Sequence, residues 1–199
     1  MPSNNITIIF HCLLPQSMLL KKYSTKWIND FNKIKNEIEK ALSGLGFSIE
    51  HVGSTAVANL DAKPIIDIDI IYSKQPDFEI IKSRLENIRY YHNGNQGIEN
   101  RDVFKRKGIS TDNILDKIQH HLYVCPTNSK ALERHILSRN FLRENDWARL
   151  KYQEMKYELA EKAHQDKKVY AALKENNIND FIDAIIKKEK LLQINNYLA

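Results

Sequence analysis

The stretch that decides the fold runs from residue 51 to residue 71 and reads HVGSTAVANLDAKPIIDIDII. Its last part alternates, with Asp67 and Asp69 separated by isoleucines. Successive side chains of a strand point to opposite faces, so both carboxylates point one way and the isoleucines point into a core. The rise per residue places the two carboxylates about 7 Å apart along the strand. We expect this pair to lie on a solvated face and to hold a cation between its charges.

The turn before this strand contains Gly53, Ser54 and Thr55. Glycine permits a tight turn and a close approach of the backbone to a ligand. Ser54 and Thr55 suit the cap of a helix whose free N–H groups favour phosphate. Hard oxygen ligands such as Asp67 and Asp69 suit Mg²⁺ or Mn²⁺, and Mg²⁺ often holds substrate phosphates as well. The alternative is a purely structural turn beside charges that protect an edge strand; the two features together favour a phosphate and metal site.

The combination of Gly53-Ser54 with Asp67-Ile68-Asp69 resembles the signature of the nucleotidyltransferase superfamily, which has a polymerase-beta-like fold. More closely, EHVGSTAV at 50–57 and KPIIDI at 63–68 resemble the GrpB family. The same resemblance extends to Gly97-Ile98 with Arg101, HHLYV at 120–124, RNFLR at 139–143, Lys156 and Lys174. It covers residues 20–185 and implies a mixed sheet with packed helices, followed by a C-terminal helical region.

The resemblance also implies an activity and a set of site residues. In the superfamily such an aspartate pair binds one or two Mg²⁺ ions, and an acceptor hydroxyl attacks the α-phosphorus of a nucleoside triphosphate. Asp67 and Asp69 are therefore the expected catalytic and metal-binding residues. The expected nucleotide- or phosphate-binding residues are Gly53, Ser54, Thr55, Lys63, Arg101, Arg139 and Lys156. The expected pocket-lining residues are His51, His121 and Tyr123.

Several of these residues have an equally plain structural interpretation. Lys63 near the start of the strand either contacts phosphate or is solvated. Arg139 and Arg143 share a helix face, where they form either a phosphate-binding wall or surface charge. A histidine on a strand is more often a hydrogen-bonded pocket or core residue than a metal ligand.

A third acid is missing from the strand where the superfamily usually places one. The natural strand, residues 119–125, reads QHHLYVC. Asp102 and Glu99, on or near the preceding hairpin strand, are the candidates to substitute. Without such an acid the two-metal assignment is not supported, and the alternatives are a different reaction or a non-catalytic module that binds a nucleotide or a coenzyme-A-like ligand. A purely structural protein is a third alternative.

Length and composition limit the partners that we expect. The 199 residues carry a net charge of +5, with 42% hydrophobic and 28% charged residues. This mild excess suits a nucleoside triphosphate or another phosphorylated small molecule, and the basic residues are too dispersed to predict a nucleic-acid partner. Cys12 and Cys125 predict neither a disulfide framework nor a zinc site, and we expect free thiols in the cytoplasm. No stretch reaches transmembrane length, so we expect no membrane partner.

Hydrophobic periodicity predicts an α/β or α+β chain. We expect a nucleotidyltransferase-like α/β core over residues 1–127 and a C-terminal helical subdomain over residues 128–199, packed as a single compact unit. The expected strands are 47–52, 64–72, 101–107 and 117–125, with a further strand or a disordered leader at 6–14. The expected helices are 24–43, 76–89, 129–144, 147–165, 166–175 and 178–195.

Overall fold

A five-stranded mixed sheet forms the centre of the computed structural model, which describes residues 19–108 and 112–198. The strand order is β1-β2-β5-β4-β3. The pair β2 and β5 is parallel, and the other neighbouring pairs are antiparallel. The strands are β1 (Phe47–Val52), β2 (Ile66–Tyr72), β3 (Tyr90–His92), β4 (Asp102–Arg106) and β5 (His120–Pro126). The strand or leader expected at 6–14 lies outside the described residues.

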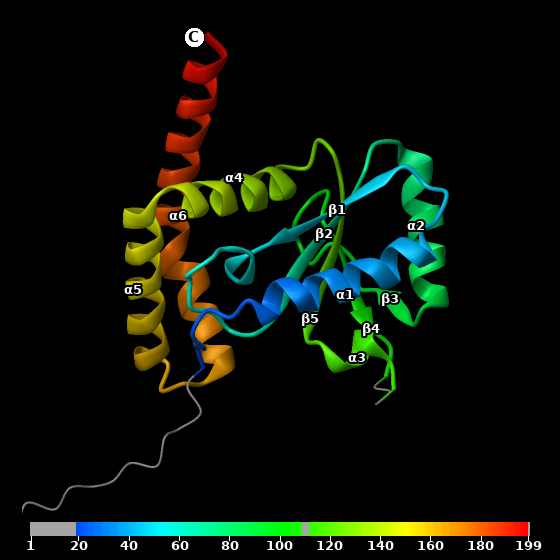
Figure 1. Cartoon of the computed structure of the whole chain (residues 1–199), viewed down its shortest axis with the longest axis horizontal. Helices are drawn as coiled ribbons and strands as arrows, with labels where there is room; N and C mark the ends of the chain where they lie inside the picture. Colours follow the sequence, from blue (N-terminus) through cyan, green and yellow to red (C-terminus); the bar gives the residue numbers. More distant parts are fainter. Residues whose placement is uncertain (1–18, 109–111, 199) are drawn as a thin grey trace, which may run out of the picture.

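Three helices pack with one face of the sheet around the larger hydrophobic core (Figure 1). They are α1 (Lys26–Ala41), α2 (Gln75–Asn87) and α3 (Ile114–Lys117). Most large apolar side chains of α1 are buried, but Ile28 is exposed. Ile28 follows the buried Trp27 directly, and a helix turns by about 100° per residue, so the two cannot share the core face. The even-numbered isoleucines of β2, Ile66, Ile68 and Ile70, complete this core.

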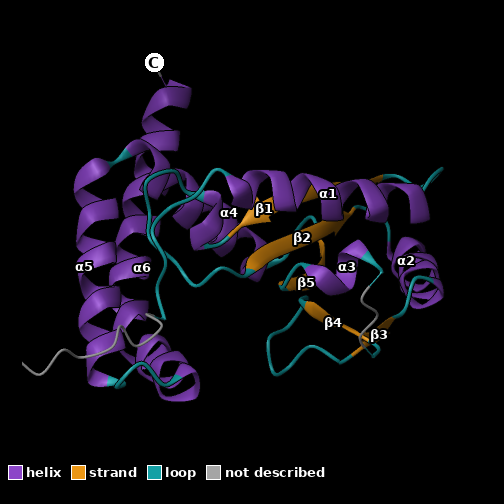
Figure 2. Cartoon of the chain, turned by 60° about the horizontal axis from the view of Figure 1, so that its bottom comes forward, coloured by secondary structure: helices purple, strands orange, loops and turns teal. Residues whose placement is uncertain are grey.

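The remaining helices build a second hydrophobic core with the loop that leads into β2. They are α4 (Lys130–Glu144), α5 (Asp146–Lys162) and α6 (Lys167–Leu198). Figure 2 shows α5 and α6 side by side next to one end of the sheet. We expected two helices after residue 165, but α6 is continuous. Its sequence contains neither proline nor glycine, and Asn176-Asn177 alone did not interrupt it.

The structure differs from the expected elements in three further places. The expected strand at 117–125 begins as the short helix α3, and β3 was not expected at all. Leu150 of α5, an apolar residue expected on the buried side of the helix at 147–165, is exposed. The division of the chain at residues 127 and 128 stays a prediction. Within the two described ranges, no helix combines the length and the apolar character that crossing a membrane requires.

Candidate functional site

Asp67 and Asp69 lie on the face of β2 that points away from the larger core. Asp67 Oδ1 accepts a hydrogen bond from His121 Nδ1 at 2.8 Å, and Asp69 Oδ2 accepts one from His135 Nδ1 at 2.8 Å. The expectation of a solvated pair is wrong for Asp69, whose side chain is completely buried, whereas that of Asp67 is 29% exposed. His135 lies on α4, so this helix contacts Asp69 through that hydrogen bond.

The second oxygen of Asp69 suits a metal ion. Among the described residues, Asp69 Oδ1 is buried without a hydrogen-bond partner. A buried carboxylate oxygen without a partner is unfavourable, and a bound cation satisfies it. The donor set fits Mg²⁺, because Asp67 and Asp69 supply hard oxygen ligands from one face of a strand. These two residues would therefore hold the ion.

Neither candidate for a third acid joins the pair. Asp102 accepts a hydrogen bond from His92 at 2.7 Å, and its neighbour Val103, not Asp102, pairs with Tyr123 of the site face. Asp102 therefore belongs to the opposite face of β4. Glu99 is exposed in the loop before β4. Over residues 19–108 and 112–198, no group of three or more acidic, histidine or cysteine side chains could hold a metal ion.

Gly53 brings the turn after β1 against Asp67. Its φ of 71° lies in the left-handed region, and a Cβ atom there would come within 2.3 Å of Asp67 Oδ2. Residues Ser54–Ala56 form a single 3-10 turn, η1, and no side chain caps it. The expected helix cap at Ser54 and Thr55 is thus wrong, and the turn places backbone, not a helix dipole, beside the carboxylate.

His51 and Thr55 brace this turn from inside the protein. The two side chains form a hydrogen bond of 3.0 Å, and the hydroxyl of Thr55 donates to the carbonyl of Ile65 at 3.3 Å. The ring of His51 stacks on Phe31, with 4.6 Å between centroids. Burial lowers the pKa of His51 to about 4, so the ring is neutral near pH 7.

Arg139 and Arg143 hold the same turn from α4. Arg139 donates to the carboxylate of Glu50 at 2.5 Å and to the carbonyl of His51 at 2.9 Å. Arg143 donates twice to the carbonyl of Ala56, at 2.9 and 2.7 Å. Both guanidinium groups therefore bind the protein's own backbone, and Arg139 lines neither of the cavities described below.

We expect Arg139→Met to lower the free energy of unfolding by about 2 kcal/mol, because it leaves a buried carbonyl and a carboxylate without their donor. Chemical denaturation measures this change. Arg134→Met is the matched control, since Arg134 pairs with exposed Asp183 and a surface ion pair contributes about 0 to 1 kcal/mol. Equal losses in the two variants would contradict a bracing role for Arg139.

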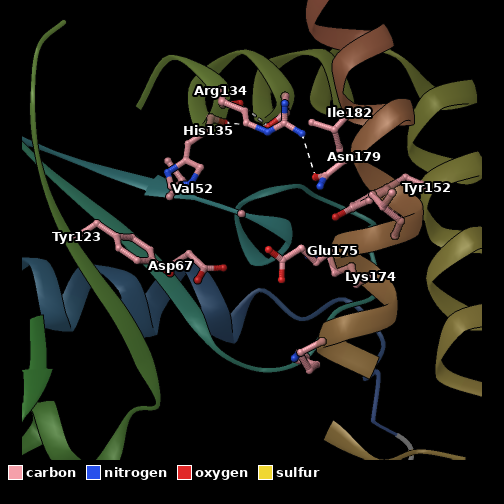
Figure 3. A pocket seen from close by; sticks show the side chains of 15 residues that line it. Val52, Asp67, Tyr123, Arg134, His135, Tyr152, Lys174, Glu175, Asn179 and Ile182 are labelled. Atoms are coloured by element: carbon pink, nitrogen blue, oxygen red, sulfur yellow. Dashed lines mark hydrogen bonds between the residues drawn. The ribbon is translucent and has the colours of Figure 1, made fainter. Parts of the chain in front are cut away.

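Two adjoining cavities open beside Asp67. Their volumes are about 390 and 240 Å³, and they share Lys63, Asp67, Tyr123 and Lys174 in their linings. Figure 3 shows Asp67 between Tyr123 on one side and Lys174 of α6 on the other. The larger cavity continues between α4 and α6, past His135, Tyr152 and Asn179. The smaller one reaches Ser54, Thr55, His121 and Tyr170.

Three lysines line the smaller cavity. Lys156 is almost fully buried, and its ammonium donates to the carbonyl of Asp61. Burial and the neighbouring Lys174 hold the pKa of Lys156 well below its usual range and also lower that of Lys63. The ammonium of Lys63 lies 5.0 Å from the ring centroid of Tyr170. Cations gathered in a partly desolvated cavity favour an anionic ligand.

The structure gathers most, not all, of the residues predicted for the site. Those that line the cavities are Gly53, Ser54, Thr55, Lys63, Asp67, His121, Tyr123 and Lys156. Those that line neither cavity are His51, Asp69, Arg101 and Arg139. Sequence reasoning missed His135, Tyr152 and Tyr170. The spacing of four residues between His135 and Arg139 places both on one side of α4 and was the available signal for His135.

Two solved structures share the fold of this chain. The crystal structure of the conserved protein GrpB from Enterococcus faecalis covers 85% of this chain and 98% of its own, at a TM-score of 0.70 and 27% identity. Cid1 in complex with its short product ApU covers 70% of this chain and 42% of its own, at a TM-score of 0.50 and 10% identity. The fold is therefore nucleotidyltransferase-like, as predicted.

Curated relatives extend over most of the chain. The glutamate-rich protein GrpB of Alkalihalophilus pseudofirmus is 30% identical over 172 residues, which are 86% of this chain and 95% of that protein. The UPF0157 protein YqkA of Bacillus subtilis is 28% identical over 152 residues, 76% of this chain, and this chain spans only 42% of YqkA. The profile described as GrpB protein matches residues 17–188. The chain belongs to the GrpB family.

Proposed function

We propose that this protein is a Mg²⁺-dependent nucleotidyltransferase that moves a nucleotidyl group from a nucleoside triphosphate to an acceptor hydroxyl. One observation carries the proposal: the carboxylate of Asp67, beside the Gly53 turn, opens directly onto a cavity lined by three lysines. Carboxylates bind the metal ion, and the lysines match the charge of a triphosphate. The likeness of the fold to Cid1, solved with its short product ApU, supports the same reaction class.

Each group has a place in this reaction. Ser54, Lys63 and Lys174 hold the β- and γ-phosphates, while His121 and His135 fix the orientation of Asp67 and Asp69. When bound, Mg²⁺ supplies neutralisation of the phosphate charge. The acceptor oxygen forms a bond to the α-phosphorus, the bond from that phosphorus to the β-phosphate oxygen breaks, pyrophosphate leaves, and the hydroxyl proton passes to water. Catalysis of this kind is mostly positioning and electrostatics.

Calorimetry and a transfer assay test the proposal together. Wild-type protein is titrated with ATP, CTP, GTP and UTP, each with and without Mg²⁺, and then incubated with α-labelled triphosphate and a panel of hydroxyl compounds. We expect Mg²⁺-dependent binding and release of labelled nucleotide bound to an acceptor. Affinities that are the same with and without Mg²⁺ would contradict the proposal.

Lys63→Gln provides a more specific check of the phosphate contacts. We expect about tenfold weaker triphosphate binding, because a charge-assisted hydrogen bond contributes on the order of 1.4 kcal/mol. Lys168→Gln removes the same charge from an exposed position that lines neither cavity, so it serves as the control. If both variants bind as the wild type does, Lys63 is solvated and the triphosphate lies elsewhere.

A second candidate function follows from the missing third acid. A module with the same fold would bind a nucleotide or a coenzyme-A-like ligand without transferring anything. The observation that favours it is that no third acid joins Asp67 and Asp69 within the described ranges. Binding without turnover in the transfer assay would select this module over the enzyme. In either case we place the protein in the cytoplasm, in keeping with the free thiol of buried Cys125.

A further inference from the structure

Arg101 differs from every other arginine in the described part of the chain, because its guanidinium has neither a hydrogen-bond acceptor nor a carboxylate partner. Arg149 forms an ion pair with Asp146, and the remaining arginines donate to a carboxylate or a backbone carbonyl; they are Arg84, Arg89, Arg106, Arg134, Arg139 and Arg143. The guanidinium of Arg101 lies instead over the ring of Tyr123, 4.9 Å from its centroid. Its Nε is buried without a hydrogen-bond partner, as is the Nε of Arg149, but Arg149 is paired with Asp146.

An arginine with free N–H donors and a fixed orientation is suited to bind an anion. A guanidinium carries five N–H donors in a planar fork that matches an oxyanion. Stacking on Tyr123 fixes the plane of the fork but satisfies none of its donors. A buried donor without an acceptor is unfavourable. The N–H groups of Arg101 are without acceptors in the free protein, and a bound anion would accept hydrogen bonds from them.

Arg101 lies on the opposite side of the aspartates from the lysines. Asp69 pairs with Tyr123 across β2 and β5, and Tyr123 pairs with Val103 across β5 and β4. Alternation along β4 then places Lys105 on the same face as Arg101. The lysines of the cavity come from α5, α6 and the loop before β2. Figure 2 shows β4 on the side of the sheet away from α5 and α6.

In the proposed transfer, the lysine side of the aspartates and the Arg101 side would bind different substrates, the triphosphate and the acceptor. In an in-line displacement, the attacking oxygen and the leaving oxygen stand on opposite sides of the phosphorus. If pyrophosphate leaves into the lysine-lined cavity, the acceptor approaches from the side of β5 and β4. That approach passes His121, Tyr123 and Arg101.

We infer that Arg101 binds an oxyanion carried by the acceptor, which is a small hydroxyl compound bearing a phosphate monoester or a carboxylate. The role as acceptor rests on the proposed function, but the anion site itself does not. A nucleic-acid strand is a poorer fit, because such ligands are held through many phosphate contacts, whereas Arg101 is a single guanidinium without an acceptor.

Chemical modification tests the anion site on the wild-type protein without any turnover. Phenylglyoxal reacts with accessible guanidinium groups, and mass spectrometry of digests measures the rate at each arginine. The probes are glycerol, glycerate and glycerol 3-phosphate, which share a backbone and differ in charge. We expect glycerol 3-phosphate or glycerate to slow the modification of Arg101 at least fivefold and glycerol to have no effect. The more protective of the two identifies the source of the oxyanion.

Protection by none of the three compounds would overturn the inference. So would protection only by an oligonucleotide, tested as a trinucleotide in a parallel arm, since that result would point to a nucleic-acid acceptor.

Binding measurements with variants complete the test. We expect Arg101→Gln to weaken binding of the protective anion at least tenfold, and Arg101→Lys to weaken it less because the charge remains. Lys117→Gln, at an exposed position at the end of α3, is the charge-matched control and should bind as the wild type does. Equal affinities of the wild type and Arg101→Gln for the protective anion would contradict the inference.

The same titrations separate this inference from the proposed function. Triphosphate affinity is measured on the same samples. Loss of Mg²⁺-dependent triphosphate binding in the wild type would remove the proposed function and leave the anion site standing. Normal Mg²⁺-dependent triphosphate binding, without protection or binding by either anion, would remove the anion site and leave the proposed function standing.

Discussion

Gly53→Ala should abolish Mg²⁺-dependent triphosphate binding, with a loss of at least a hundredfold in affinity. A Cβ atom at this position would lie 2.3 Å from Asp67 Oδ2 and 3.0 Å from its carboxyl carbon. Real contacts of this kind do not occur, so either the turn or the carboxylate must move. Because β2 is a central strand between β1 and β5, the side chain of Asp67 is the part that can rotate away.

The backbone adds a second penalty. Gly53 has φ 71° and ψ −171°, a combination essentially restricted to glycine, and holding another residue there disfavours the fold by about 1 to 3 kcal/mol. Calorimetry with ATP and Mg²⁺ measures the affinity, and denaturation measures the stability. Asp67→Ala should lose binding to the same degree without the backbone penalty.

Gly44→Ala is the matched control for this prediction. Gly44 has φ 83°, but a Cβ atom there would meet nothing within 4 Å. The control therefore carries strain in the backbone without contact at Asp67, and we expect it to lose stability while it binds ATP normally. If Gly53→Ala bound as tightly as Gly44→Ala, the close approach of the turn to Asp67 would have no role in binding.

Acidification should lower the free energy of unfolding by about 3 kcal/mol between pH 6.5 and pH 4 through His51 alone. Burial lowers the pKa of this residue to about 4 from its ordinary value of 6.5. In that window the unfolded chain binds a proton that the folded protein rejects, so stability rises with pH. The stability that neutral His51 contributes is complete above pH 6.5 and is lost as the pH falls to about 4. The size of the loss follows from about 1.36 kcal/mol for each unit of pKa difference between the folded and unfolded states.

Urea denaturation at a series of pH values measures this dependence. His51→Gln keeps an amide donor for Thr55 but cannot titrate, so the difference between the two proteins isolates His51. Burial also lowers the pKa of His120, which adds a loss of the same sign to both proteins. Parallel curves for wild type and His51→Gln would show that His51 charges without penalty.

The central motif could be predicted from the sequence because its chemistry is local. The alternation of aspartate and isoleucine in β2 determines which side chains face the core, and glycine at position 53 indicates a close approach. The burial of Asp69 was not predictable in the same way. It depends on α4, because His135, which bonds to Asp69, lies 66 residues farther along the chain.

The helices show the same limit. The stripe on α1 follows from its periodicity, but the continuity of α6 depends on packing against α4 and α5 and not on propensity alone. Arg139 carried two interpretations in the sequence, a phosphate ligand or surface charge. The structure shows a third arrangement, in which its guanidinium joins Glu50 and the backbone of β1. The sequence of α4 alone does not predict that Arg139 bonds to the carbonyl of His51, 88 residues away.

The course of α6 has a consequence for the order in which the site is assembled. Lys174, which both cavities share, lies on the element that follows all the others along the described chain. A nascent polypeptide that has left the ribosome only through α5 already contains both aspartates and the glycine turn, yet lacks one wall for the triphosphate. Capture of nucleotide should therefore begin only when synthesis has passed α6, and ligand would reach a growing chain too late to guide the folding of its sheet.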